Sequence, residues 1–182
     1  MKKAIFIDKD GTLVHDVPYN VNPQLITLKA DAGQILKRLK DHGYLLIIIS
    51  NQTGVARGLF PKKSLNTVSQ RIQELLKPWG IAIDDFFFCP HDINGKVAPY
   101  IKQCECHKPQ TGMFLKAVKK YNIDISASWS IGDKLSDIEA SRRVGCKAIL
   151  LSNNNISEDN NYMQKPDFII KEWQEIINII NL

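Results

Sequence analysis

The chain has 182 residues, of which 44% are hydrophobic and 24% charged, and this composition suits one globular domain with a substantial core. The net charge of +5 is compatible with anionic substrates, but lysine and arginine are spread along the chain without a basic run. The chain contains no apolar run of about 18 residues, as a membrane span needs. The apolar stretch behind Met1–Lys3 is too short for a signal peptide, so we expect a cytoplasmic protein. Because the sequence shows no heptad pattern, we expect a monomer.

Strand-like and helix-like segments alternate along the whole chain. Continuous apolar runs predict strands, and apolar residues at helical spacing predict helices. The expected strands are residues 5–8, 44–50, 86–88, 128–131, 148–151 and 168–170, and the expected helices are residues 32–42, 65–76, 113–121, 136–144 and 173–181. The segments 11–29 and 153–161 are expected to be irregular, the second as a surface loop. This order predicts an α/β fold, a Rossmann-like three-layer sandwich with a mainly parallel central sheet, in one domain spanning 1–182.

Polar clusters directly follow three of these strands. Asp8-Lys9-Asp10-Gly11-Thr12 follows the first strand, Ser50-Asn51 ends the second, and Gly132-Asp133-Lys134 follows a later one. In a parallel α/β sheet the carboxyl ends of the strands lie along one edge, where ligands bind. We therefore expect the three clusters to meet in one site.

The two aspartates of the first cluster indicate a cation site. Asp8 and Asp10 are expected on the same side of an extended segment, because strand side chains alternate. Gly11 permits a sharp turn behind them. Acids at the end of a buried strand need solvation, which a bound cation supplies. A turn with two solvated aspartates is the alternative, and the placement of the other clusters favours the metal site.

A second group of metal-ligating residues lies in the segment 89–106. Cys89 and His91 form one close pair, and Cys104 and Cys106 form another behind a 12-residue loop. Three thiolates and one imidazole complete a tetrahedral Zn²⁺ site, which predicts a structural zinc loop. Buried free thiols beside an unrelated histidine are the alternative. Cys146 lies in a separate segment and is expected to be a small buried hydrophobe.

The motifs together resemble the haloacid dehalogenase superfamily of phosphatases. The resemblance lies in Asp-x-Asp-Gly-Thr, Ser-Asn, a later lysine, and Gly-Asp-Lys-x-x-Asp, each in its expected place relative to a strand. It implies that Asp8 is the nucleophile that forms an aspartyl-phosphate. It implies that Asp10 protonates the leaving oxygen and then activates water, while Ser50 and Lys108 stabilise the transferring phosphoryl group.

The same resemblance implies a catalytic Mg²⁺ ion. Its ligands are Asp8, the backbone carbonyl of Asp10, and Asp133, an all-oxygen set that suits this ion. Asp137 is expected to support the site as a first-turn helix acid. The short 12–31 segment and the absence of a long insertion argue against a large cap domain.

Within the superfamily the chain looks like the D-glycero-D-manno-heptose-1,7-bisphosphate 7-phosphatase family, with histidinol-phosphate phosphatase as a close relative. The resemblance is carried by Asp-Lys-Asp-Gly-Thr, the segment 50–58, the Cys/His loop and Gly-Asp-Lys-Leu-Ser-Asp. It implies a small phosphorylated sugar as substrate and a place in building nucleotide-activated heptose for lipopolysaccharide. The implied substrate contacts are Asp16, Tyr19, Asn51, Gln52, Thr53, Arg57, His107 and Lys134.

One position departs from the family pattern. His107 stands where the heptose members usually carry arginine, and an imidazole cannot grip a second phosphate in the bidentate way of a guanidinium. Arg57 is a candidate for the missing cation, and His107 itself is an alternative zinc ligand. At this stage the choice between heptose bisphosphate and histidinol phosphate, and the preferred anomer, stay open.

A zinc-stabilised binding module, for example for nucleic acid, is the opposing class of function. The basic net charge favours it, but the chain lacks clustered basic residues with interleaved aromatics. A polynucleotide 3'-phosphatase of the same superfamily is intermediate between the two classes. We expect neither a nucleic acid nor a membrane as partner.

Overall fold

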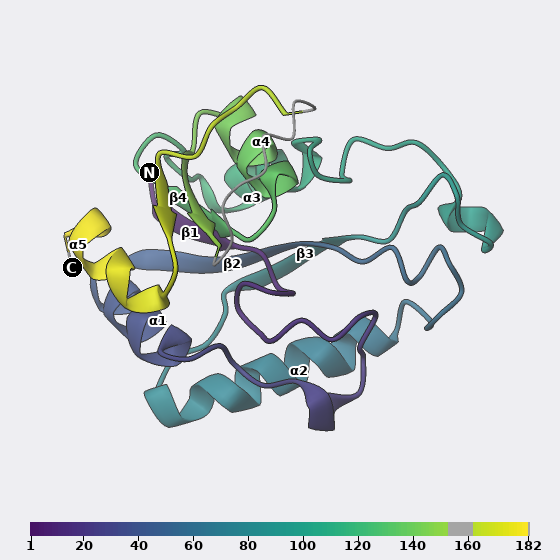
Figure 1. The fold of residues 1–182 in the computed structure, drawn as a ribbon, viewed down its shortest axis with the longest axis horizontal. Helices are drawn as coiled ribbons and strands as arrows, with labels where there is room; N and C mark the ends of the chain where they lie inside the picture. The colour runs from purple at the N-terminus through teal and green to yellow at the C-terminus, as the bar shows by residue number, and fades with distance from the viewer. Residues whose placement is uncertain (153–161, 182) are drawn as a thin grey trace.

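The centre of the computed structural model, which describes residues 1–152 and 162–181, is one sheet of six parallel strands (Figure 1). Their spatial order is β3-β2-β1-β4-β5-β6. The strands are β1 (Lys3–Ile7), β2 (Tyr44–Asn51), β3 (Asp85–Cys89), β4 (Trp129–Gly132), β5 (Lys147–Leu151) and β6 (Phe168–Ile170). The predicted α/β fold with a parallel sheet is therefore confirmed.

Helices cover both faces of the sheet. The α-helices are α1 (Ala32–Asp41), α2 (Ser64–Leu76), α3 (Gly112–Tyr121), α4 (Leu135–Arg143) and α5 (Ile176–Ile180). Short 3₁₀ helices are η1 (Pro23–Leu25), η2 (Lys77–Trp79), η3 (Ala98–Tyr100) and η4 (Trp173–Glu175). Figure 1 shows α1 and α2 on one side of the sheet and α3 and α4 on the other, which makes the predicted three layers.

The alternation of side chains along β1 explains why both faces are covered. Ile5 and Ile7 are fully buried in one apolar cluster with residues of α1, α2 and α5. Ala4 and Phe6 point the other way, into a cluster with α3, where the rings of Phe6 and Phe114 lie 4.9 Å apart. A strand buried on both faces needs an unbroken apolar sequence, as observed here.

The strand order places a topological switch point between β1 and β4. From β1 the chain adds β2 and β3 on one side, and from β4 it adds β5 and β6 on the other. Ligands of open α/β sheets bind outside the carboxyl ends of the strands at such a point. Asp8 and Asp133 directly follow β1 and β4, so the fold itself brings the two acids together.

The predicted elements are all present, with ends that shift by one or two residues. The expected helix 173–181 differs, because it begins with the 3₁₀ turn η4 before α5. Glu175 explains this start, since its Oε1 accepts the backbone N–H groups of Lys171 at 2.7 Å and Glu172 at 3.0 Å. The expected loop 153–161 lies outside the described residues.

Between β1 and α1 the described chain contains no cap domain. That segment holds η1 and an isolated bridge between Val14 and Leu28. A cap was not expected, and the carboxyl edge of the sheet is therefore bordered by loops. Within the described ranges, none of the helices combines the length and the apolar character that crossing a membrane requires.

Candidate active site

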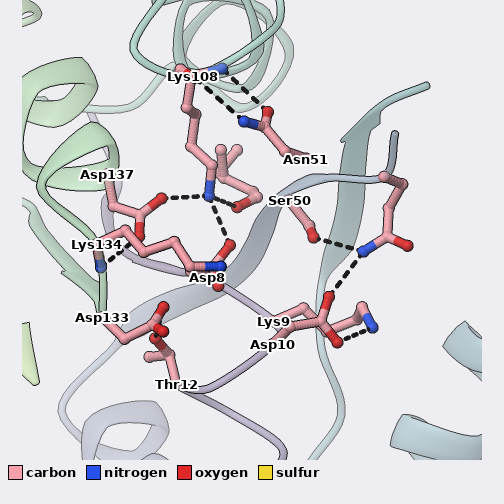
Figure 2. Close-up of polar contacts among 12 residues, drawn as sticks. Asp8, Lys9, Asp10, Thr12, Ser50, Asn51, Lys108, Asp133, Lys134 and Asp137 are labelled. Atoms are coloured by element: carbon pink, nitrogen blue, oxygen red, sulfur yellow. Dashed lines mark hydrogen bonds and ion pairs between the residues drawn. The ribbon is translucent and has the colours of Figure 1, made fainter. Parts of the chain in front are cut away.

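The three polar strand ends meet at the carboxyl edge of the sheet (Figure 2). Asp8 comes from the end of β1, Ser50 from the end of β2, and Asp133 from the end of β4. Lys108 reaches this edge from the loop behind the Cys/His cluster, and Asp137 from the first turn of α4. The structure thus brings together the residues that the sequence places far apart.

Lys108 is a buried cation beside the nucleophile candidate Asp8. Its Nζ contacts Asp8 Oδ1 at 2.6 Å, Asp137 Oδ1 at 2.6 Å and the Ile49 carbonyl oxygen at 2.7 Å, so each of its three N–H groups has an acceptor. Only 3% of its side chain is exposed. Burial alone would lower the pKa of Lys108, but Asp137 and Asp8 outweigh burial and raise it. The ammonium therefore stays charged next to Asp8.

Asn51 fixes the backbone of Lys108. Its Oδ1 accepts the Lys108 N–H at 3.0 Å, and its Nδ2 donates to the Lys108 carbonyl at 3.1 Å. These two bonds fasten the loop to the end of β2. The side-chain amide of Asn51, which the sequence suggested as a substrate contact, thus already forms hydrogen bonds that position Lys108.

Asp10 is held from two sides. Its Oδ1 pairs with Lys9 Nζ, and its Oδ2 accepts Gln52 Nε2 at 2.9 Å. The same Gln52 nitrogen donates to Ser50 Oγ at 2.9 Å, which links the end of β2 to the acid (Figure 2). Lys9 was missed in the sequence, although a cation between two acids is a visible signal, and its side chain is only 2% exposed.

The carboxylates around Asp133 fit a hard divalent cation. Asp8, Asp133 and Asp137 offer oxygens that all lie within 4.8 Å of one another. Burial, reinforced by the charges of Asp8 and Asp137, raises the pKa of Asp133 to about 7. Three carboxylates this close repel one another, which a cation between them would relieve, and an all-oxygen donor set matches Mg²⁺.

Two neighbours show that this acid cluster is a built site. Gly11 has φ +84°, and a Cβ there would lie 2.3 Å from Asp133 Oδ2, so glycine alone lets the turn approach the carboxylate. Thr12 Oγ1 donates to Asp133 Oδ1 at 3.3 Å. Asp137 is already engaged, because one oxygen pairs with Lys108 and the other accepts the Lys134 N–H at 3.1 Å. Asp8 and Asp133 are thus the better placed ligands.

The Cys/His cluster has the donors and the spacing of a tetrahedral zinc site. The four ligand atoms of Cys89, His91, Cys104 and Cys106 lie within 4.8 Å of one another. Cys106 Sγ is 2.7 Å from Cys89 Sγ and 3.2 Å from His91 Nδ1, and none of these cysteines forms a disulfide. Burial is the main cause that raises the pKa of the Cys89 thiol, so a thiolate there needs a cation at the centre. The set fits Zn²⁺ with no open position.

A cavity of about 450 Å³ opens beside the acids. It is lined by Asp10, Asp16, Pro18, Tyr19, Asn51, Gln52, Thr53, Gly54, Arg57, Asp92, His107 and Lys134. All the substrate contacts suggested by the sequence are among these residues. Asp92 was missed, because nothing in its local sequence shows that it faces the same space as Arg57.

Lys134 and His107 differ in what they offer to this cavity. Burial would lower the pKa of Lys134, but the carboxylates of Asp133 and Asp8 outweigh it and raise the pKa, so Lys134 is a cation. His107 Nδ1 lies 3.1 Å from the His91 carbonyl oxygen, outside the four-ligand zinc cluster. His107 as a spare zinc ligand therefore receives no support from the geometry.

Comparison with known sequences identifies relatives that align with most of the chain. A family model described as "HAD-hyrolase-like" matches residues 105–176. The D-glycero-beta-D-manno-heptose-1,7-bisphosphate 7-phosphatase of Haemophilus ducreyi is 33% identical over 181 residues, which cover 99% of both chains. The D-glycero-alpha-D-manno-heptose-1,7-bisphosphate 7-phosphatase of Photorhabdus laumondii is 41% identical over 145 residues, covering 79% of this chain and 78% of the relative.

Solved structures share the fold over the full chain. The D,D-heptose 1,7-bisphosphate phosphatase of B. bronchiseptica, complexed with magnesium and phosphate, has a TM-score of 0.84 and 25% identity and covers 98% of each chain. A putative HAD-like phosphatase of Mesorhizobium loti has a TM-score of 0.85 and 26% identity, covering 99% of this chain and 85% of the other. The carboxylate cluster described above thus belongs to a fold that holds magnesium and phosphate in a relative.

Proposed function

This chain belongs to the D-glycero-D-manno-heptose-1,7-bisphosphate 7-phosphatase family of haloacid dehalogenase-like hydrolases, and on that premise we propose that it removes the 7-phosphate of D-glycero-D-manno-heptose 1,7-bisphosphate. One observation carries this proposal. Asp10, beside the nucleophile, lines the same cavity as the cations Arg57 and Lys134. A substrate with two phosphates can therefore place one at the acids and the other near a cation of the wall.

Asp8 is the proposed nucleophile. Its carboxylate oxygen forms a bond to phosphorus while the bond from phosphorus to the sugar oxygen breaks, which gives an aspartyl-phosphate. The ammonium of Lys108, 2.6 Å from Asp8 Oδ1, pairs with the carboxylate and stabilises charge on the transferring group. Ser50 Oγ is the proposed hydroxyl donor to the same phosphoryl oxygens.

Asp10 is the proposed acid and base. It gives its proton to the leaving sugar oxygen, and it then takes a proton from the water that attacks the aspartyl-phosphate. Both oxygens of its carboxylate are oriented by Lys9 and Gln52. Such orientation holds the Asp10 carboxyl group beside the leaving sugar oxygen in the first half-reaction and beside the attacking water in the second.

Asp8, Asp133 and the backbone carbonyl of Asp10 are the proposed ligands of a catalytic Mg²⁺, which when bound neutralises charge on the phosphoryl oxygens. Cys89, His91, Cys104 and Cys106 are the proposed ligands of a structural Zn²⁺. The zinc site would order the loop that delivers Lys108, which follows Cys106 by two positions. The product, a heptose 1-phosphate, would serve the making of nucleotide-activated heptose for lipopolysaccharide.

A comparison of substrates tests the proposal. Phosphate release would be measured with both anomers of heptose 1,7-bisphosphate and with histidinol phosphate at matched concentrations. Histidinol phosphate is the second candidate, because His107 replaces the arginine usual in the heptose members. We expect the higher kcat/KM with a heptose bisphosphate, and an equal or higher value with histidinol phosphate would overturn the assignment. Asp8→Asn should lose turnover by at least about 10³-fold with every substrate.

A further inference from the structure

The cavity needs a cation for the phosphate that does not react. Its wall contains two permanent cations, Lys134 and Arg57. Lys134 lies in the field of Asp133, Asp8 and Asp137, at the end where the reacting phosphate binds. Arg57 sits on the 53–58 turn and faces the carboxylate of Asp92 instead. Arg57 is therefore the cation available for a second phosphate.

His107 is poorly suited to that task. The His91 carbonyl oxygen can only accept a hydrogen bond, so His107 Nδ1, 3.1 Å away, carries the proton of this contact. That contact leaves a single ring nitrogen of His107 for a phosphate, whereas a guanidinium presents five N–H donors in a planar fork. The guanidinium is therefore the better partner for the second phosphate.

Arg57 is held in one orientation by two contacts. Its Nε donates to Asp92 Oδ2 at 2.6 Å, and its Nη1 donates to the hydroxyl of Tyr19. The guanidinium carbon also lies 5.6 Å from the centre of the Tyr19 ring. Within the described residues Nη2 has no hydrogen-bond acceptor, and 44% of the side chain is exposed. The guanidinium thus has donors left for an anion in the cavity.

Tyr19 has an unusual backbone that supports this contact. Its φ is +54°, in the left-handed region that residues other than glycine adopt rarely. Such a conformation persists where the surroundings impose it, commonly at ligand sites. Here it brings the phenol of the 8–31 segment against Arg57.

Asp92 is fixed more firmly than Arg57. Its Oδ1 accepts the Asn94 N–H at 2.9 Å, its Oδ2 faces Arg57, and only 9% of the side chain is exposed. It directly follows His91, one of the four ligands of the zinc cluster. The carboxylate is therefore a preset acceptor that determines where Nε of Arg57 lies.

The two loops are also joined through their backbones. The Ala56 carbonyl oxygen accepts the N–H groups of Lys96 at 2.6 Å and Val97 at 2.9 Å. A Cβ at Gly95 would lie 2.7 Å from that oxygen, so glycine is needed for the close approach. The Cys/His loop thus sets both the backbone next to Arg57 and the direction of its side chain.

We propose that Asp92 is a positioning residue that aims Arg57 at the non-reacting phosphate of the substrate. The inference rests on the proposed function and deepens it, because it assigns recognition of the second phosphate to the zinc loop. If the Asp92–Arg57 pair only joined two loops, its loss would affect the kinetics of all substrates equally. A positioning role affects only substrates that carry a phosphate at both ends.

Kinetics with a bisphosphate and a monophosphate separate these roles. We would measure kcat and KM with heptose 1,7-bisphosphate and heptose 7-phosphate for the wild type, Arg57→Met and Asp92→Asn. Loss of a charge-assisted contact predicts a rise of about tenfold in KM for the bisphosphate in both variants, with kcat little changed. KM for the monophosphate should change by less than about twofold. Lys37→Met, which breaks a remote pair with Asp41 on α1, is the matched control.

A double variant tests whether Asp92 acts through Arg57. If it does, Arg57→Met combined with Asp92→Asn raises KM no further than Arg57→Met alone. Tyr19→Phe leaves the zinc loop untouched and should also raise KM for the bisphosphate alone. If Asp92→Asn does not retain its zinc, as measured by metal analysis, the Tyr19 and Arg57 variants decide the question.

Different results would overturn the positioning role of Asp92 and the proposed phosphatase function. Equal effects of the Arg57 and Tyr19 variants on both substrates, or additive effects in the double variant, overturn the positioning role alone. Absence of phosphate release from heptose 1,7-bisphosphate by the wild-type protein overturns the proposed function.

Discussion

Lys108 and Asp8 lie 100 positions apart in the chain, yet Lys108 Nζ is 2.6 Å from Asp8 Oδ1. The same ammonium pairs with Asp137 Oδ1 at 2.6 Å, and all three side chains are almost fully buried. A buried pair is costly to break, because the remaining charge keeps its desolvation cost without its partner. This cation therefore connects the stability of the site with its chemistry.

Lys108→Met should damage both properties. It leaves Asp8 and Asp137 buried without a counter-charge, which should lower the free energy of unfolding by about 3–5 kcal/mol. The lost charge stabilisation should lower kcat by about 10²–10³-fold. Urea unfolding and phosphate release measure the two effects. Adding Asp137→Asn removes one stranded acid and should restore part of the stability without restoring kcat, and restored kcat would contradict the role of Lys108.

Mg²⁺ binding should depend on pH around neutrality. Because the pKa of Asp133 is raised to about 7 without metal, Mg²⁺ must displace a proton below that pH. We expect the dissociation constant to rise by up to about tenfold per pH unit below the pKa, and calorimetry at about pH 6 and about pH 8 measures it. The metal-free protein should also lose stability as pH rises from about 4 to about 7, because its folded state keeps the proton to higher pH than the unfolded chain. Equal Mg²⁺ affinity at both pH values would contradict this assignment.

Gly11→Ala and Gly43→Ala form a matched pair of substitutions. Both glycines have positive φ, +84° and +81°, but a Cβ at Gly11 would lie 2.3 Å from Asp133 Oδ2, whereas nothing lies within 4 Å of a Cβ at Gly43. Both changes should cost about 1–2 kcal/mol of stability through the backbone. Gly11→Ala alone should also displace Asp133 and weaken Mg²⁺ binding, seen as a higher Mg²⁺ concentration for half-maximal activity. Equal Mg²⁺ requirements of the two variants would contradict the close approach.

Lys9→Met tests how Asp10 is oriented. The buried Lys9 ammonium contacts Asp10 Oδ1 while Gln52 contacts Oδ2, so its removal frees one side of the proposed acid. Misorientation of a proton donor should lower kcat by about tenfold to hundredfold and leave KM nearly unchanged. Lys9→Arg keeps the charge and should retain more activity. A wild-type kcat in folded Lys9→Met would contradict the role of Lys9 in orienting Asp10.

The meeting of Asp8, Ser50 and Asp133 could be predicted because it follows from periodicity alone. Apolar runs mark parallel strands, parallel strands end at one edge, and the first polar residues behind them must lie there. The Cys/His cluster was visible as residue types at close spacing, and Asp8 and Asp10 indicated a cation site, whereas the family resemblance added Asp133 as a ligand. The six strands and the alternating helices followed from the same periodicities, with their ends least certain.

Other contacts depend on loops whose path no local pattern determines. In an extended segment Lys9 would point away from Asp8 and Asp10, but β1 ends at Ile7 and the chain turns at Gly11, so the Lys9 ammonium pairs with Asp10. The hydrogen bonds between Asn51 and Lys108 join residues 57 positions apart in the chain, and the ion pair of Arg57 with Asp92 joins residues 35 positions apart. Amide and carboxylate groups have many partners of equal chemistry, so only the tertiary structure selects among them.

Loss of the proposed zinc ion should act on the active site through the loop that carries Lys108. Cys106 and Lys108 are two positions apart, and His107 between them contacts the backbone of His91. Cys104→Ser removes one ligand, so we expect less than one zinc per chain and faster hydrogen exchange over residues 91–108. Since Asn51 still clamps Lys108, the loss of kcat should be partial, about tenfold.

Cys146→Ala is the control for that substitution. Cys146 is a buried thiol outside the cluster, so its variant should keep zinc, slow exchange and wild-type kcat. Metal analysis, exchange and phosphate release would be measured on the same samples. If zinc-free Cys104→Ser remains folded and turns over at the wild-type rate, the metal stabilises the loop without reaching Lys108. In that case the two bonds from Asn51 suffice to place the ammonium beside Asp8.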